Sequence, residues 1–217
     1  MAPTVKSAAQ NAASQNATPP AARTATCERN TRETQIACSV DLDGVGRAEI
    51  QCEIGFFAHV LDAFARHAHV DLSLTIAGDL YIDQHHTVED TGIVLGTALR
   101  QALGERRGIW RTGSCRFPMD ETLAECAIDL SGRPCLFFDA KCERQHVGDL
   151  DADLVLEFFG GLTTALAANI HLELIRGGND HHRVEALFKA FGRAFELAAA
   201  RHPRAVAELP STKGHLG

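Results

Sequence analysis

The sequence lacks several features that would assign it to a specialised class of protein. No apolar run in its 217 residues approaches the roughly 18 residues that a membrane helix needs. It has no C-x-x-C pair, which argues against a cysteine-type zinc ribbon. Acidic residues outnumber basic ones, 28 to 21, and the net charge is −7, so nucleic acid is not an expected partner. The remaining composition, with 45% hydrophobic residues, is that of an ordinary globular protein.

The cysteines are an odd number, seven, and no signal peptide precedes them. These two facts fit reduced thiols better than a disulfide framework. We therefore expect free and mostly buried cysteines in a cytoplasmic protein that does not contact a membrane.

Both ends of the chain have a polar composition. Residues 1–22 consist mainly of Ala, Ser, Asn, Gln, Thr and Pro. Such a segment cannot bury enough apolar area to offset the entropy of ordering, so it predicts a disordered tail. The tail also lacks acidic residues, as organellar transit peptides do, and that alternative stays open. Residues 209–217 are expected to form a mobile C-terminal segment.

Between these ends the hydrophobic pattern predicts two similar α+β halves, at residues 23–115 and 116–208. Alternation predicts two strands of a β-hairpin, at 34–40 and 48–51, joined by a turn at 41–44. Other expected elements are helices at 57–66, 87–103, 154–168 and about 182–200, and strands at 70–76, 109–117, 123–130, 134–141 and 170–175. The repeated order indicates an internal duplication.

Eleven histidines carry the chemical signal of the sequence, and four of them form two matching pairs. Each pair opens a predicted helix in an H-H-x-x-E motif, and the motifs lie 96 residues apart: His85-His86-Thr87-Val88-Glu89 and His181-His182-Arg183-Val184-Glu185. Adjacent imidazoles on a helix point about 100° apart, so one motif can face two metal ions. Imidazole and carboxylate ligands together suit Mn, Fe, Ni or Zn. The alternative is that these polar residues only cap the helix starts.

Two further histidines lie on the helix before the first motif. His59 and His67 are two turns apart on nearly the same face, from which they could reach a metal site. A single His on an amphipathic helix is more often structural, so spacing alone leaves the role of His59 open.

Several longer motifs resemble those of imidazoleglycerol-phosphate dehydratase, in order, over about residues 23 to 214. They include Gly55-Phe56-Phe57-x-His59, Asp83-x-His85-His86-Thr87-Val88-Glu89-Asp90, Asp129-Leu130-Ser131-Gly132-Arg133-Pro134, Asn179-x-His181-His182-x-x-Glu185-x-x-Phe188-Lys189-Ala190 and Ser211-Thr212-Lys213-Gly214. Motifs of this length and order are not matched by chance.

The resemblance implies a hydro-lyase of histidine biosynthesis, which removes water from D-erythro-imidazole-glycerol phosphate to give imidazole-acetol phosphate. It also implies an α+β fold of two similar halves, each a four-stranded sheet packed against helices (ribosomal protein S5 domain 2-like). Two Mn²⁺ ions per subunit and a homo-oligomer of 24 subunits, with the sites between subunits, belong to the same expectation.

Carried over residue by residue, the resemblance assigns three groups of functional residues. The metal ligands are His59, His85, His86, Glu89, His181, His182 and Glu185. The phosphate-binding residues are Arg111, Arg133, Lys189, Ser211 and Lys213. The candidates for proton transfer at the substrate are Glu33, His67, Glu89 and Glu185.

One expected ligand differs from the family pattern. The His before Phe-Phe in the second half is Glu157 here. Carboxylate can replace imidazole on Mn²⁺, which accepts oxygen ligands readily, so our hypothesis is that Glu157 is a metal ligand. The alternative function is a divergent paralogue that keeps the assembly and metal sites but is catalytically impaired.

Overall fold

The computed structural model describes residues 22–216. The predicted disordered tail therefore lies outside the described residues, apart from Ala22. Within the described part of the chain, no helix is long and apolar enough to cross a membrane.

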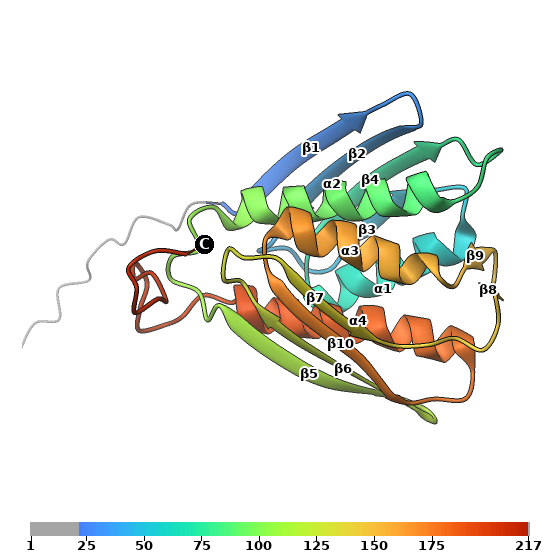
Figure 1. Cartoon of the computed structure of the whole chain (residues 1–217). Coiled ribbons are helices and arrows are strands. Elements are labelled where there is room, and N and C mark those ends of the chain that lie inside the picture. Colours follow the sequence, from blue (N-terminus) through green and yellow to red (C-terminus); the bar gives the residue numbers. More distant parts are fainter. Residues whose placement is uncertain (1–21, 217) are drawn as a thin grey trace, which may run out of the picture.

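Residues 22–216 form two four-stranded sheets and four helices. The helices lie between the two sheets, as Figure 1 shows. The first sheet has the order β1-β2-β4-β3, from β1 (Thr24–Asn30), β2 (Thr34–Asp41), β3 (Ala48–Gln51) and β4 (Asp71–Gly78). The second has the order β5-β6-β10-β7, from β5 (Thr112–Met119), β6 (Thr122–Asp129), β7 (Cys135–Asp139) and β10 (Asn169–Arg176). The helices are α1 (Gly55–Ala68), α2 (His85–Leu103), α3 (Leu154–Leu166) and α4 (Asp180–Ala199).

The same strand order in both sheets confirms the predicted α+β fold of two similar halves. The second half has one addition, a two-stranded hairpin of β8 (His146–Val147) and β9 (Leu150–Asp151). The sequence boundary between the halves stays a prediction, and β5, which begins at Thr112, already belongs to the second sheet.

The predicted hairpin of residues 34–51 is wrong. β2 pairs with β1 and β4, and β3 pairs in parallel with the far side of β4. The segment between β2 and β3 carries the chain past the end of β4, where the Asp71 carboxylate accepts hydrogen bonds from the backbone N–H groups of Val45 and Arg47. Alternation identified both strands, but their partner comes later in the chain.

All seven cysteines are free, as predicted. Only Cys38 and Cys126 are fully buried, and Cys135 is exposed. The expectation that most are buried was too strong, because Cys27 and Cys115 lie on β1 and β5, at the edges of the two sheets.

Glycines allow helices of the two halves to cross at backbone contact. A Cβ on Gly96 of α2 would lie 2.5 Å from the Leu162 carbonyl oxygen and 3.0 Å from the Leu166 nitrogen of α3. A Cβ on Gly192 of α4 would lie 2.9 Å from the Phe64 carbonyl oxygen and 3.1 Å from the Ala68 nitrogen of α1. The two crossings are therefore equivalent, and they match α3 to α1 at a spacing of 98 residues.

We expect Gly92→Ala to destabilise the protein. Its Cβ would lie 2.2 Å from the Phe158 carbonyl oxygen, and this contact cannot be relieved by a side-chain rotation. The free energy of unfolding should fall by about 1–3 kcal/mol, as for other overpacked sites. Gly160→Ala is the matched control, since no other helix or strand of the described residues comes within 4 Å of its added Cβ, and it should stabilise by about 0.5–1 kcal/mol. Denaturant unfolding measures the free energy of unfolding of both variants. Equal stability of Gly92→Ala and the wild type would contradict the close contact between α2 and α3.

Candidate functional site

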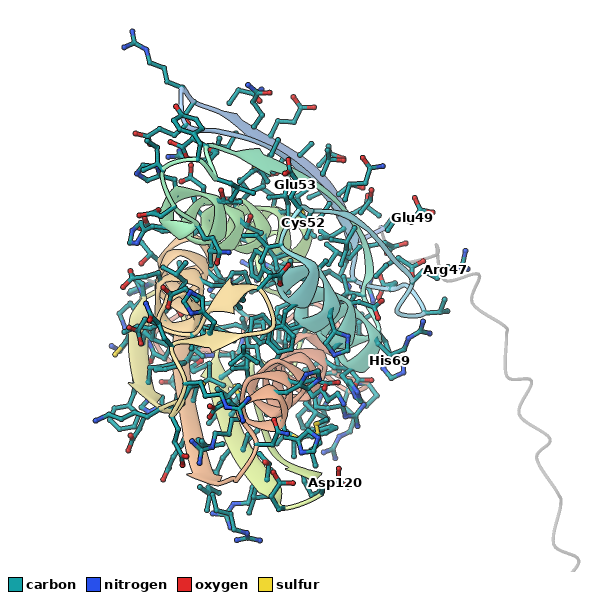
Figure 2. All side chains as sticks on the ribbon, turned by 90° about the vertical axis from the view of Figure 1, so that its right-hand side faces the viewer. Arg47, Glu49, Cys52, Glu53, His69 and Asp120 are labelled. Carbon is teal, nitrogen blue, oxygen red and sulfur yellow. The ribbon has the colours of Figure 1, made fainter. Side chains whose placement is uncertain are left out.

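All four helices begin at the same end of the molecule, on the right in Figure 1. Figure 2 looks onto this end, with Asp120 labelled at the tip of the second sheet and Glu53 just before α1. Both His pairs lie in the first turns of their helices, because α2 begins at His85 and α4 at Asp180. The Asn179 side chain caps α4 by accepting a hydrogen bond from the His181 backbone N–H.

Three predicted ligands from two helices meet in one cluster. The ligand atoms of His59, His181 and Glu185 all lie within 4.8 Å of one another. Glu185 Oε2 is 3.4 Å from His59 Nε2 and 3.1 Å from His181 Nε2. Two imidazoles and one carboxylate converging in this way are a donor set for a divalent transition metal.

Glu185 is held in its ionised form. Its burial opposes ionisation, but hydrogen bonds from Lys189 and His59 outweigh that effect and keep the pKa of Glu185 below its ordinary value. Lys189 Nζ lies 2.8 Å from Glu185 Oε1, so the other oxygen, Oε2, is the one that faces the imidazoles. Lys189, one of the five predicted phosphate-binding residues, therefore lies beside the cluster.

The second His of each pair is oriented by a carboxylate. His86 Nδ1 lies 3.2 Å from both oxygens of Asp79, and His182 Nδ1 lies 3.0 Å from Glu121. A carboxylate on Nδ1 fixes the ring and leaves Nε2 free for a ligand. Asp79 raises the pKa of His86, while the Asn179 backbone N–H and then His182 lower the pKa of Glu121 to about 2.

Sequence reasoning gave no role to Asp79 or Glu121. Asp79 follows β4, and Glu121 lies in the turn between β5 and β6. Their contacts with His86 and His182 depend on how the helices pack on the sheets. Asp120 joins Glu121 and His182 in the second group of described residues whose ligand atoms lie within 4.8 Å.

His85, Glu89 and Glu157 are less closely grouped. His85 Nε2 lies 3.4 Å from Glu89 Oε2. Glu157 belongs to neither ligand group found among residues 22–216, and it lines a cavity of about 440 Å³ together with Leu187 and Arg183. The helix crossings nevertheless place Glu157 on α3 where His59 lies on α1, since the two are 98 residues apart.

The two substrate-side candidates lie on different elements. Glu33 is exposed in the turn between β1 and β2, with Oε2 4.0 Å from His86 Nε2. His67 is half-buried near the end of α1, with its ring edge-on to Phe117 at 5.0 Å. Burial, and then the charge of Lys189, lower the pKa of His67.

The other phosphate candidates lie away from the cluster, toward the opposite end of the molecule. Arg111 donates two hydrogen bonds to Asp129, at 2.6 and 2.9 Å, and its backbone N–H donates to the Ala198 carbonyl. Ala198 is roughly 20 Å along α4 from Glu185, from the rise of a helix. Ser211 and Lys213 belong to the C-terminal segment, which Arg111 contacts through the Pro210 carbonyl at 2.7 Å, and Arg133 is exposed.

The geometry defines a class of protein: a duplicated α+β fold whose paired helices start with matching imidazole and carboxylate groups. A family model described as imidazoleglycerol-phosphate dehydratase matches residues 52–195. The chain is 51% identical over 196 residues to the imidazoleglycerol-phosphate dehydratase of Halorhodospira halophila, covering 90% of this chain and 100% of that one. It is 53% identical over 194 residues to that of Acidiphilium cryptum, covering 89% and 99%.

Solved structures agree with the sequence relatives. The dehydratase from Staphylococcus aureus matches with a TM-score of 0.74 and 37% identity, covering 82% of this chain and 99% of that one. The dehydratase from Pyrococcus furiosus matches with a TM-score of 0.72 and 34% identity, covering 87% and 99%. The chain belongs to the imidazoleglycerol-phosphate dehydratase family, and its activity is that of a hydro-lyase in histidine biosynthesis.

We expect the stability of the wild type to fall relative to His67→Gln as the pH is lowered through about 6.5. The pKa of His67 is lowered in the folded protein from its ordinary value of 6.5. Below that pH the unfolded chain therefore binds a proton that the folded chain does not. The free energy of unfolding of the wild type then falls relative to that of His67→Gln. Denaturant unfolding of both proteins at pH 7.5 and 5.5 measures this difference. A difference that does not change with pH would contradict the shift.

Proposed function

We propose that this chain performs the dehydration with two Mn²⁺ ions per subunit, at sites shared between copies in a homo-oligomer of 24 subunits. The observation that carries the proposal is the convergence of His59, His181 and Glu185 on one point. Neither the fold nor the comparisons favour the impaired paralogue. A cytoplasmic location fits the seven free thiols.

The first metal position suits the residues present. His59, His181 and Glu185 offer three ligand atoms, and one oxygen of Glu185 stays bound to Lys189. When bound, the metal would act as a Lewis acid on the imidazole ring of the substrate. The second position would be formed by His85, Glu89 and Glu157, the residues that the duplication matches to the first set.

His86 and His182 would complete the two positions. Their Nδ1 atoms are engaged by Asp79 and Glu121, so Nε2 of each ring remains for a metal ion.

The reaction needs groups that donate and accept protons. The hydroxyl on the carbon next to the ring takes up a proton and leaves as water, while the C–H of the neighbouring carbon loses its proton to a base. The resulting enol then gains a proton at the carbon next to the ring and loses its O–H proton, which gives the ketone. His67 is suited to the base role, since its lowered pKa keeps it neutral at pH 7. Glu33, Glu89 and Glu185 are the other candidates, and Glu185 is ionised.

The phosphate needs a separate cationic pocket, and its position requires a second copy. The substrate places the phosphate about three carbons from the ring, far less than the roughly 20 Å that separate Glu185 from the backbone beside Arg111. Arg111, Arg133, Ser211 and Lys213 of one copy would therefore serve the metal end of another, where Lys189 already lies. Exposed apolar residues before α2, Tyr81 at 87% and Ile82 at 60%, offer a surface for that contact.

Mixed oligomers test the shared site. We expect Lys213→Ala and His181→Ala to be inactive alone, and co-assembled subunits of both kinds to regain activity. Random pairing of two variants leaves roughly one site in four with both native residues. The assay is turnover of imidazole-glycerol phosphate with Mn²⁺, and two inactive His181 variants co-assembled with each other are the control. Failure of the first mixture to regain activity would contradict a site shared in this way.

Metal analysis tests the second position. If Glu157 is a ligand, purified Glu157→Gln should contain about half of the wild-type Mn²⁺, since one of two sites loses a charged ligand. Glu105→Gln is the control, because its carboxylate forms an ion pair with Arg107 within residues 22–216 and is 80% exposed. Metal stoichiometry equal to that of the wild type would exclude Glu157 as a ligand.

A further inference from the structure

One segment of the second half touches the start of three helices. We call it the connecting segment, residues 141–151, which contains β8 and β9. In Figure 2 it crosses in front of the helix starts, in yellow. Its contacts are hydrogen bonds to the first residues of α1, α2 and α4, the helices that carry seven of the proposed metal ligands.

At α1, Asp149 supplies the cap that the local sequence lacks. The N-cap residue of α1, Ile54, has no side-chain oxygen to accept the free N–H groups of the first turn. Asp149 Oδ2 accepts from the Gly55 N–H at 2.6 Å, and Oδ1 accepts from the Phe56 N–H at 2.8 Å. A carboxylate at this position also interacts favourably with the helix dipole.

Phe56 links this cap to the first metal cluster. Its ring centroid lies 4.9 Å from that of His181 and 5.9 Å from that of His59. The turn before Asp149 must approach closely, because a Cβ on Gly148 would lie 2.9 Å from Phe56 Cβ and the φ angle of Gly148 is +63°. Asp149 therefore contacts the first turn of α1 beside a ring that packs against the imidazoles of His59 and His181.

At α2, the same turn contacts the residue that precedes the first His pair. Gln84 Nε2 donates to the Asp149 carbonyl at 2.6 Å, and Gln84 Oε1 accepts from the Asp151 N–H at 3.0 Å. His85 follows Gln84 directly. One turn of the chain therefore contacts the starts of the helices that carry His59 and His85.

The other end of the connecting segment is fixed to α4. The Asp180 carboxylate accepts from the backbone N–H groups of Glu143 and Arg144, at 3.0 and 2.9 Å. Arg183 donates to the Lys141 carbonyl at 3.3 Å. The segment is thus hydrogen-bonded to helix starts at both of its ends.

We propose that Asp149 is a positioning residue for both metal positions, acting through Gly55 and Phe56 on His59 and through Gln84 on His85. This inference rests on the proposed function, because it assumes that these histidines bind Mn²⁺. It means that Asp149, which lies outside the ligand motifs, influences the affinity for Mn²⁺.

The test compares Asp149→Ala, Asp149→Asn and the control Asp153→Ala. Asp153 is exposed at the start of α3 and its side chain forms no capping hydrogen bond. Mn²⁺ affinity is measured by titration with electron paramagnetic resonance of the bound ion, and hydrogen exchange of residues 55–61 is measured on the metal-free protein. Asp149→Ala should weaken Mn²⁺ binding by about tenfold or more and speed exchange at the start of α1. Asp149→Asn keeps one acceptor oxygen and should recover part of both losses.

Unchanged Mn²⁺ affinity in Asp149→Ala would overturn the inference alone, as would equal losses in Asp153→Ala. A wild-type protein that binds no Mn²⁺ would overturn the proposed function and the inference with it. Should Asp149→Ala fail to assemble, Gln84→Met removes two hydrogen bonds of the same turn without changing charge. It should weaken Mn²⁺ binding in the same direction, and wild-type affinity in this variant would contradict the inference.

Discussion

The close crossing of parallel helices is the contact on which the rest of the structure depends. Gly96 brings α2 against the backbone of α3, and Gly192 brings α4 against α1. Because the helices of each pair run in the same direction, their first turns lie side by side at one end. His59 and Glu185, from different halves of the chain, meet at 3.4 Å only in this register.

Carboxylates organise the end of the molecule that these crossings create. Glu185 lies between two imidazoles, Asp79 orients His86, and Glu121 orients His182. Such an end favours cations and opposes the phosphate of the substrate. Cationic residues such as Arg111 lie at the other end of the molecule, and this separation of charge within one copy supports the proposal that copies share a site.

Local patterns predicted most of the helices and strands, because spacing of apolar residues reports which face is buried. The edge strand β1 was not predicted as a separate element, since much of it is exposed and its outward residues are polar. The pairing of β2 with β3 was wrong for a different reason. A turn motif indicates that the chain reverses direction. It does not give the strand order, because β4 comes later in the chain and lies between β2 and β3.

The sequence by itself determined the duplication and its chemistry, because two H-H-x-x-E motifs at helix starts need only local spacing to be recognised. It also indicated the family through motifs that run along most of the chain. Tertiary structure alone decided which of the proposed ligands meet. It placed His59 with the second motif, matched Glu157 to His59 and brought Asp149 to the start of α1. These contacts join residues about 90 or more positions apart, and no local pattern encodes the helix crossings that bring them together.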